Sequence, residues 1–205
     1  IVASTGIIGV RLPIERIRSG LKTITLTKEG GHEAARGIMT TDTRPKEVAV
    51  QVEIDGRPVT IGGIAKGAGM IHPNMATMFA FISTDAAIAA PFLQQLVQRA
   101  VGVSFNMVDI DGDTSPSDTV AVLANGLAGN GPLRPGTAAT EAFANALDYV
   151  CQTLAKAIVR DGEGATKLIE VRVRGAASGN DARLAARAVT ASSLVKAAVH
   201  GNDPN

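Results

Sequence analysis

Tryptophan is absent from this 205-residue sequence, and tyrosine and cysteine each occur once. The lone cysteine, Cys151, excludes an internal disulfide framework and is typical of a protein from a reducing compartment. We interpret it as a small apolar core residue on a helix. The formal net charge is only +1, so there is no electrostatic case for binding nucleic acid or an anionic membrane surface. No apolar run reaches the length of a membrane span.

Hydrophobic residues, at 45%, and charged residues, at 19%, give the composition of a globular domain. Apolar spacings of three and four residues predict helices, and alternation or short apolar runs predict strands. The predicted helices cover 13–21, 32–39, 91–101, 140–160 and 181–199, and the predicted strands cover 47–54, 58–64, 78–82, 119–124 and 168–174. Since helices and hairpin strands occur in blocks, the pattern favours an α+β fold over a doubly wound parallel sheet.

The chemically most informative stretch is KGAGMIHPNMATMFAFISTD, residues 66–85. Its glycine-rich start, its turn and its apolar end would present Thr77 at the mouth of a core. A threonine hydroxyl needs a base, and an N-terminal threonine can use its own α-amine, which titrates near ~8. Because Thr77 is internal, this role requires cleavage between Ala76 and Thr77. The alternative is that Thr77 is an ordinary β-branched strand residue.

Lys66 and Glu163 each allow two interpretations. Lys66 stands eleven residues before Thr77 and is either a cation for a substrate carboxylate or a neighbouring amine, or a solvated surface lysine. Glu163, between two glycines in RDGEGATK, either binds an amine or is a solvated loop charge. His72 stands beside a proline, and we interpret it as structural because an N-terminal threonine needs no histidine.

Two further patterns have the residue types of an oxyanion hole and of a metal site. Thr5 and Gly6 could supply paired donors for an oxyanion, although Thr-Gly is also a common turn pair. Alternating aspartates at 109, 111 and 113 invite a calcium-loop interpretation. That interpretation fails, because Thr114 and Val120 occupy the positions that require glycine and glutamate. The sequence therefore predicts no metal.

The stretch KGAGMIHPNMATMFAFISTDA resembles the self-cleavage signature of the ornithine acetyltransferases, also called glutamate N-acetyltransferases. The segments IVASTGIIGVRLP, MTTDT and RDGEGATK resemble further stretches of that family in the same order. The resemblance implies that residues 1–205 are the central part of one catalytic domain, cut between 76 and 77 into the end of an α chain (1–76) and the start of a β chain (77–205). It also implies a layered αββα sandwich similar to N-terminal-nucleophile folds.

The resemblance assigns roles to single residues of this sequence. Thr77 is expected to be the nucleophile and Ala76–Thr77 the cleaved bond, and the remaining expected site residues are Thr5 and Gly6 for the oxyanion hole and Thr40, Lys66 and Glu163 for the substrate. Thr41 is a close rival of Thr40. Glu163 is expected to recognise an amine.

The function implied by the resemblance is acetyl transfer from N-acetylornithine to glutamate in arginine biosynthesis, through an acetyl-threonine enzyme and without a cofactor. Use of acetyl-CoA is an open alternative. The resemblance further implies an α2β2 heterotetramer in the cytoplasm, or in the mitochondrial matrix of a eukaryote. Two other functions compete with this one: an N-terminal-nucleophile amidase or aminopeptidase that passes the acyl group to water, and an uncleaved, non-catalytic scaffold.

Overall fold

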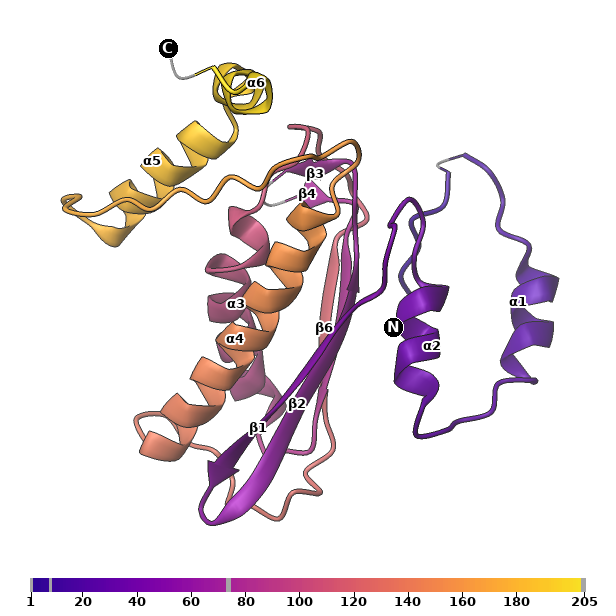
Figure 1. Cartoon of the computed structure of the whole chain (residues 1–205). Coiled ribbons are helices and arrows are strands. Elements are labelled where there is room, and N and C mark those ends of the chain that lie inside the picture. The colour runs from indigo at the N-terminus through magenta and orange to yellow at the C-terminus, as the bar shows by residue number, and fades with distance from the viewer. Residues whose placement is uncertain (1, 8, 73–74, 204–205) are drawn as a thin grey trace.

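A mixed β-sheet and the two helices packed on one of its faces form the centre of the computed structural model, which describes residues 2–7, 9–72 and 75–203 (Figure 1). The helices are α1 Ile14–Leu21, α2 Gly30–Gly37, α3 Ala90–Gly102, α4 Ala138–Arg160, α5 Gly179–Thr190 and α6 Ser193–Gly201, with a short 3-10 helix at Phe105–Met107. The strands are β1 Lys46–Ile54, β2 Arg57–Lys66, β3 Ile71–His72, β4 Met75–Ala76, β5 Phe79–Thr84 and β6 Thr119–Ala124. The predicted α+β class is confirmed.

Strands β1 and β2 form the hairpin that leads into residues 66–85. Their two-residue turn is Asp55-Gly56, and both residues have positive φ, at 52° and 70°. Asp-Gly accepts this geometry, which matches the right-handed twist of paired strands. The register runs from Ile54 opposite Arg57 to Lys46 opposite Ala65. The hairpin thus ends at Lys66, one residue before the glycine-rich loop.

The main sheet has the strand order β1-β2-β5-β6, and β5 joins its two halves. Strand β5 is antiparallel to β2 and parallel to β6. The parallel β5–β6 pair is connected through α3, as a parallel crossover requires. The second, small sheet is the β3–β4 pair, in which Ile71 lies opposite Ala76.

Helix α4 supplies the largest apolar surface against the sheet. Its buried stripe recurs every three or four residues and consists of Phe143, Ala144, Leu147, Val150, Cys151, Leu154, Ala155 and Ile158. The helix begins at Ala138, two residues before the predicted start, because Thr137 caps it by accepting a hydrogen bond from the Thr140 N–H. Cys151 is 1% exposed, in agreement with the core role expected for it.

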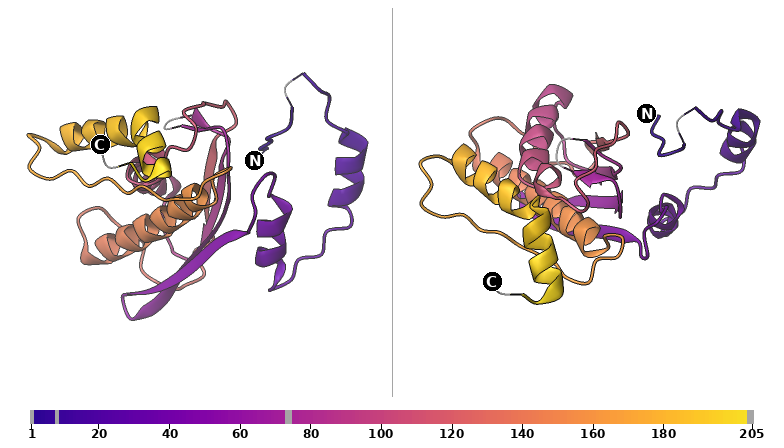
Figure 2. Two further views of the ribbon diagram at one scale, coloured as in Figure 1. Left: turned by 45° about the horizontal axis from the view of Figure 1, so that its top comes forward. Right: turned by 90° about the horizontal axis from the view of Figure 1, so that it is seen from above.

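The helices lie on both sides of the sheet, but unevenly. Helices α3 and α4 cover one face, and α2 lies on the other side with α1 beyond it (Figures 1 and 2). Helix α1 has no buried residue. Within the described residues there is thus one packed helix layer on one sheet, which is one half of an αββα arrangement. In that same part of the chain, no helix is both long and apolar enough to cross a membrane.

Two predicted elements differ from the structure at the C-terminal end. Residues 168–174 alternate as a strand would, but they run beside α5 without pairing to any described strand, and an extended segment is a strand only with a partner. The predicted helix 181–199 is two helices. Ser178 caps α5 and Ser192 caps α6, each accepting from an N–H three residues ahead, so the chain restarts its helix at Ser193.

Candidate active site

Thr77 lies between β4 and β5, at the end of the small β3–β4 hairpin. Its N–H donates to the Met70 carbonyl oxygen at 2.8 Å. Its Oγ is buried and has no hydrogen-bond partner among the described residues. Since a buried polar atom is normally paired, an unpaired hydroxyl calls for a functional explanation. The predicted turn at Pro73-Asn74 and the side chain of Ala76 lie outside what the structure describes.

Lys66, the last residue of β2, lies beside Thr77. Its Nζ donates to the Thr77 carbonyl oxygen at 3.4 Å, and the residue is 1% exposed. The expectation of a solvated surface lysine is therefore wrong. Burial lowers the pKa of the Lys66 ammonium, while the carboxylates of Asp42 and Glu163 act in the opposite direction and Lys46 lowers it further.

Glu163 reaches the same neighbourhood from the loop after α4. Its N–H donates to the Ala68 carbonyl oxygen at 2.7 Å. Its carboxylate lies directly against Gly69, where an added Cβ would be 2.6 Å from the Glu163 Oε1. The side chain is exposed, so the glycine leaves room for a solvent-accessible carboxylate beside residues 66–69. Residues 66–69 and 163 are thus brought together although almost 100 positions separate them.

Thr40 is connected to this neighbourhood through Asp42. The Thr40 N–H donates to Asp42 Oδ2 at 3.1 Å, and the Gly67 N–H donates to Asp42 Oδ1 at 2.7 Å. The Lys66 Nζ lies 4.0 Å from Asp42 Oδ2. One buried carboxylate therefore holds the backbone beside Thr40 and the backbone beside Lys66. Because this contact uses the Thr40 amide, the preference for the Thr40 hydroxyl over that of Thr41 stays a prediction.

Thr5 and Gly6 are not joined to this group. The Gly6 N–H donates to Ser4 Oγ at 3.1 Å, within its own segment. Among the described residues no hydrogen bond connects Thr5 or Gly6 to Thr77. Their expected role in an oxyanion hole stays a prediction.

Sequence reasoning missed a buried ion cluster made by Asp42, Lys46 and Asp161. The Lys46 Nζ lies 2.6 Å from Asp42 Oδ1 and 2.6 Å from Asp161 Oδ2. Burial raises the pKa of Asp42, but the Gly67 N–H, Lys46 and the Thr40 N–H lower it by more. A signal for the cluster was present in the alternation of β1, which places Lys46 on the same face as the inward Val48.

The pKa of Asp161 also lies below its ordinary value. Burial again acts to raise it, and the hydrogen bonds from Lys46 and from the Thr43 hydroxyl and N–H outweigh that effect. The Thr43 N–H donates to Asp161 Oδ2 at 3.0 Å, although 118 positions separate the two residues. Both carboxylates of the cluster are therefore held ionised by their partners.

His72 has a structural partner, in agreement with the interpretation from sequence. Its Nδ1 is hydrogen-bonded to Asp109, whose carboxylate also pairs with Lys196 of α6. Asp111 instead accepts from the N–H groups of Met70 and Ile71, at 2.6 and 3.1 Å. The acidic loop therefore fixes the backbone that leads to Thr77. In the part of the chain that the structure describes, no group of three or more His, Cys, Asp or Glu side chains could hold a metal ion.

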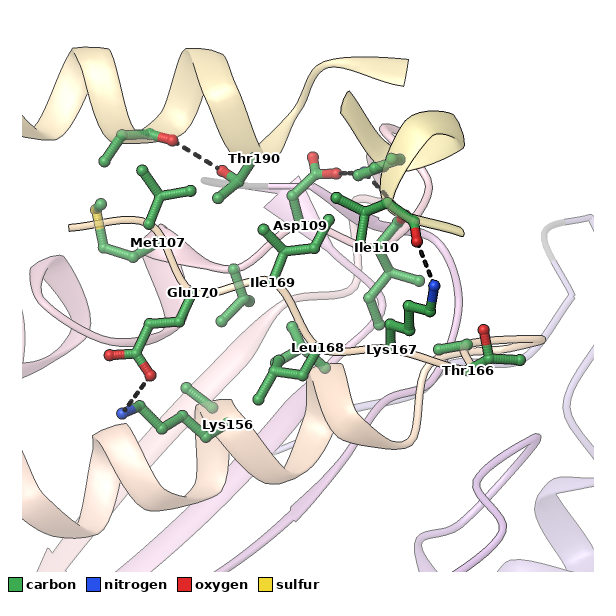
Figure 3. A pocket seen from close by; sticks show the side chains of 18 of the residues that line it. Met107, Asp109, Ile110, Lys156, Thr166, Lys167, Leu168, Ile169, Glu170 and Thr190 are labelled. Carbon is green, nitrogen blue, oxygen red and sulfur yellow. Dashed lines mark hydrogen bonds and ion pairs between the residues drawn. The ribbon is translucent and has the colours of Figure 1, made fainter. Parts of the chain in front are cut away.

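A cavity of about 470 Å³ lies between α4, the segment after it and the two C-terminal helices (Figure 3). Its lysines are paired within its own wall: Lys156 with Glu170 at 3.3 Å, and Lys167 with the Val199 and His200 carbonyl oxygens. Of the predicted site residues, only Glu163 lines it. The cavity therefore borders the candidate site without containing Thr77.

Comparisons with known proteins identify the family of the chain. Two relatives named arginine biosynthesis bifunctional protein ArgJ, from Symbiobacterium thermophilum and Dehalococcoides mccartyi, are 60% and 56% identical to this chain; each match covers 100% of the chain and 51% of the relative. The chain thus spans about half the length of the curated relatives it matches.

The crystal structure of the arginine biosynthesis bifunctional protein ArgJ from Bacillus halodurans superposes with a TM-score of 0.59 at 46% identity, covering 61% of this chain and 59% of that one. A sequence model of the ArgJ family matches residues 1–205. The chain belongs to the ArgJ family.

Proposed function

We propose that the complete protein containing this chain transfers an acetyl group from N-acetylornithine to glutamate, with Thr77 as the acetyl carrier. The observation that carries the proposal is the buried Thr77 Oγ, which has no hydrogen-bond partner among the described residues, in a residue whose carbonyl oxygen accepts from the buried Lys66 ammonium. Membership of the ArgJ family, whose relatives are named arginine biosynthesis bifunctional proteins, supports it. Acetyl-CoA as a second acetyl donor is a further possibility for the same carrier.

The first step in this proposal is hydrolysis of the Ala76–Thr77 bond, in which water gives its hydroxyl to the Ala76 carbonyl carbon and a proton to the Thr77 nitrogen. Thr77 thereby becomes an N-terminal residue with a free α-amine. Such an amine is the base that an N-terminal threonine uses. The Met70 carbonyl oxygen, which accepts from the Thr77 N–H, would hold that amine in place. The cut chains are proposed to stay together, in the α2β2 assembly that the family resemblance implies.

Acetyl transfer then proceeds in two half-reactions. The Thr77 amine takes the proton from Oγ, Oγ attacks the acetyl carbonyl carbon, and the carbon–nitrogen bond of N-acetylornithine breaks as its nitrogen takes that proton. The amine of glutamate next attacks the carbonyl carbon of the acetyl ester and loses a proton, which the Thr77 oxygen takes through the Thr77 amine as it leaves. Lys66 would bind a substrate carboxylate, Glu163 a substrate amine, and Thr5 and Gly6 the developing oxyanion.

Two measurements on the complete protein test the proposal. Intact mass should give two fragments, one beginning at Thr77. N-acetylornithine alone should release at most one ornithine per active site, and continued release should require glutamate. Thr77→Ala should abolish both cleavage and transfer, whereas Thr23→Ala, at an exposed position, should change neither. Acetate release without glutamate would instead identify an amidase. A single uncut chain without activity would favour the scaffold.

A further inference from the structure

Lys46 is a buried ammonium that the proposed chemistry does not use. It is 2% exposed, and the side chains of its partners Asp42 and Asp161 are 0% and 3% exposed. Removing such charges from water costs several kcal/mol per ion, even after relaxation of the protein. A hydrophobic trio of similar volume would avoid this cost, so the cluster needs a reason beyond stability.

The two carboxylates of the cluster hold backbone from two segments, and Asp161 itself belongs to a third. Asp42 accepts from the N–H groups of Thr40 and Gly67, at 3.1 and 2.7 Å. Asp161 accepts from the Thr43 N–H at 3.0 Å and from the Thr43 hydroxyl. These contacts connect residues 40–43, residues 66–67 and the loop that begins at residue 161. Each of these segments carries one proposed substrate residue.

We propose that Lys46 is a positioning residue whose ammonium bridges Asp42 and Asp161 and thereby fixes Thr40, Lys66 and Glu163 as one substrate cradle. This proposal rests on the proposed function, which takes those three residues as substrate contacts. Lys46 itself touches no substrate, because its Nζ lies between the two buried carboxylates. It acts by holding the backbone of the segments that do.

The bridge also leaves Lys66 available for a substrate. The Lys66 Nζ is 4.0 Å from Asp42 Oδ2, whereas the Lys46 Nζ is 2.6 Å from Asp42 Oδ1. Without the Lys46 charge, Lys66 would become the main partner of the Asp42 carboxylate. A substrate carboxylate would then have to compete with Asp42 for Lys66. Loss of Lys46 should therefore weaken substrate binding more than it slows the chemical step.

The variants are Lys46→Met, and Lys46→Met combined with Asp161→Asn. The single variant removes the buried cation of Asp161 and leaves it only the exposed Arg44, whose Nε lies 3.8 Å from Asp161 Oδ1, so it is at risk of not folding. The double variant removes one charge of each sign and keeps the shape of Asp161, so it carries the test if the single variant does not fold. Lys156→Met is the matched control, since Lys156 is a half-exposed lysine paired with a single glutamate.

The readouts in the complete protein are KM and kcat for both substrates, and hydrogen exchange of the backbone amides. In a folded variant KM should rise about tenfold or more, with kcat changed much less. The amides of Thr43, Gly67 and Glu163 should exchange faster together, while β1 and β2 stay protected. The control should match the wild type.

A folded variant with wild-type KM and unchanged exchange at Gly67 would overturn the positioning role. Uniformly faster exchange with unchanged KM would also overturn it, because that is the result of lost stability alone. If the wild-type protein transfers no acetyl group, the proposed function fails. Exchange at these three amides, which needs no substrate, then decides whether Lys46 couples the segments.

Discussion

The Lys66 ammonium donates to the carbonyl oxygen of Thr77 across 3.4 Å, and strand pairing produces this contact. Strand β2 is antiparallel to β5, and its last residue, Lys66, lies opposite Phe79. Thr77 precedes Phe79 by two residues, so it faces the end of β2. The spacing of eleven residues is thus the length of chain that leaves β2, forms the small β3–β4 hairpin and returns beside it.

Replacing Lys66 by methionine should separate activity from stability. Burial lowers the pKa of this ammonium in the folded protein. At a pH between the folded and the unfolded pKa, the unfolded chain therefore binds more protons than the folded one. The charge on Lys66 thus opposes folding near neutral pH. Asp42 would keep Lys46 and two backbone N–H donors. We expect Lys66→Met to lower kcat/KM about 100-fold. The free energy of unfolding should stay equal or rise by up to about 1 kcal/mol.

Denaturant unfolding and acetyl-transfer kinetics of the complete protein check this prediction. Lys28→Met, at an exposed lysine, is the control and should leave both quantities unchanged. A large loss of stability in Lys66→Met would mean that the ammonium is a structural ion. Full activity would mean that it is not a substrate contact.

Gly69→Ala should displace the Glu163 carboxylate. The new Cβ would lie 2.6 Å from Oε1 and 2.7 Å from Cδ of Glu163, which is too close for either atom to stay. Because Glu163 is exposed, its side chain can swing away, and Gly69 does not have the left-handed backbone that would add strain. We expect the free energy of unfolding to change by less than about 0.5 kcal/mol. KM should rise about tenfold.

Steady-state kinetics with varied N-acetylornithine and varied glutamate measure this effect. Gly20→Ala is the control, because nothing lies within 4 Å of its added Cβ. A KM for both substrates equal to the wild-type value would remove Glu163 from the substrate site.

Acid should destabilise the protein through Asp42 and Asp161. The pKa values of both carboxyl groups are lower in the folded protein than in the unfolded chain. Their ionised forms therefore stabilise the fold in full above the unfolded pKa, near ~4. This stabilisation is lost as the pH falls through the folded pKa values. Each carboxylate contributes a slope of up to about 1.4 kcal/mol per pH unit in that window. Asp161→Asn should therefore show a smaller loss of unfolding free energy between neutral and acid pH than the wild type.

Glu170→Gln is the control for the acid prediction. The pKa of Glu170 is also lowered, by Arg172 first and then Lys156, but this carboxylate is at the surface. Water screens exposed ion pairs, and their contribution to stability is small. The free energy of unfolding of Glu170→Gln should therefore depend on pH as that of the wild type does. If Asp161→Asn did so too, the buried cluster would not be a source of acid sensitivity.

Local patterns predicted the elements that form by themselves. Alternation and Asp55-Gly56 identified the β1–β2 hairpin, and the apolar stripe identified α4 within two residues of its start. Patterns were misleading at residues 168–174, where alternation is present but no described strand pairs with it. Sequence periodicity reports which face of a segment is apolar and does not report whether another strand is there to bond with it.

The candidate site was predictable where short stretches of sequence carry its residues. Lys66, Thr77 and Glu163 were identified from the sequence, and the structure brings them together. The cluster around Lys46 was missed because Lys46 and Asp161 are 115 positions apart in the sequence. In addition, Lys46 is the first residue of β1, and a charged residue at that position is typical of an exposed strand end. Long-range pairing of buried charges has no local signature, so only the fold reveals it.

Gly63→Ala should overpack the core between β2 and α4. Its added Cβ would lie 3.0 Å from Ile82 Cγ1, 3.0 Å from Leu154 Cδ1 and 3.3 Å from Val150 Cγ1. These neighbours are themselves buried, so they cannot move without disturbing others. We expect a loss of about 1–3 kcal/mol in the free energy of unfolding, measured by denaturant titration.

Gly62→Ala is the matched control, one residue earlier on the opposite face of the same strand. Its Cβ would lie 3.7 Å from Ala49 Cβ, an ordinary contact, and the position has no left-handed backbone. Restricting the unfolded chain favours alanine here, so stability should be unchanged or rise by up to about 1 kcal/mol. Since both changes add one methyl group to β2, the difference between them measures how closely α4 approaches the sheet. Equal effects would place the tight helix contact elsewhere than at Gly63.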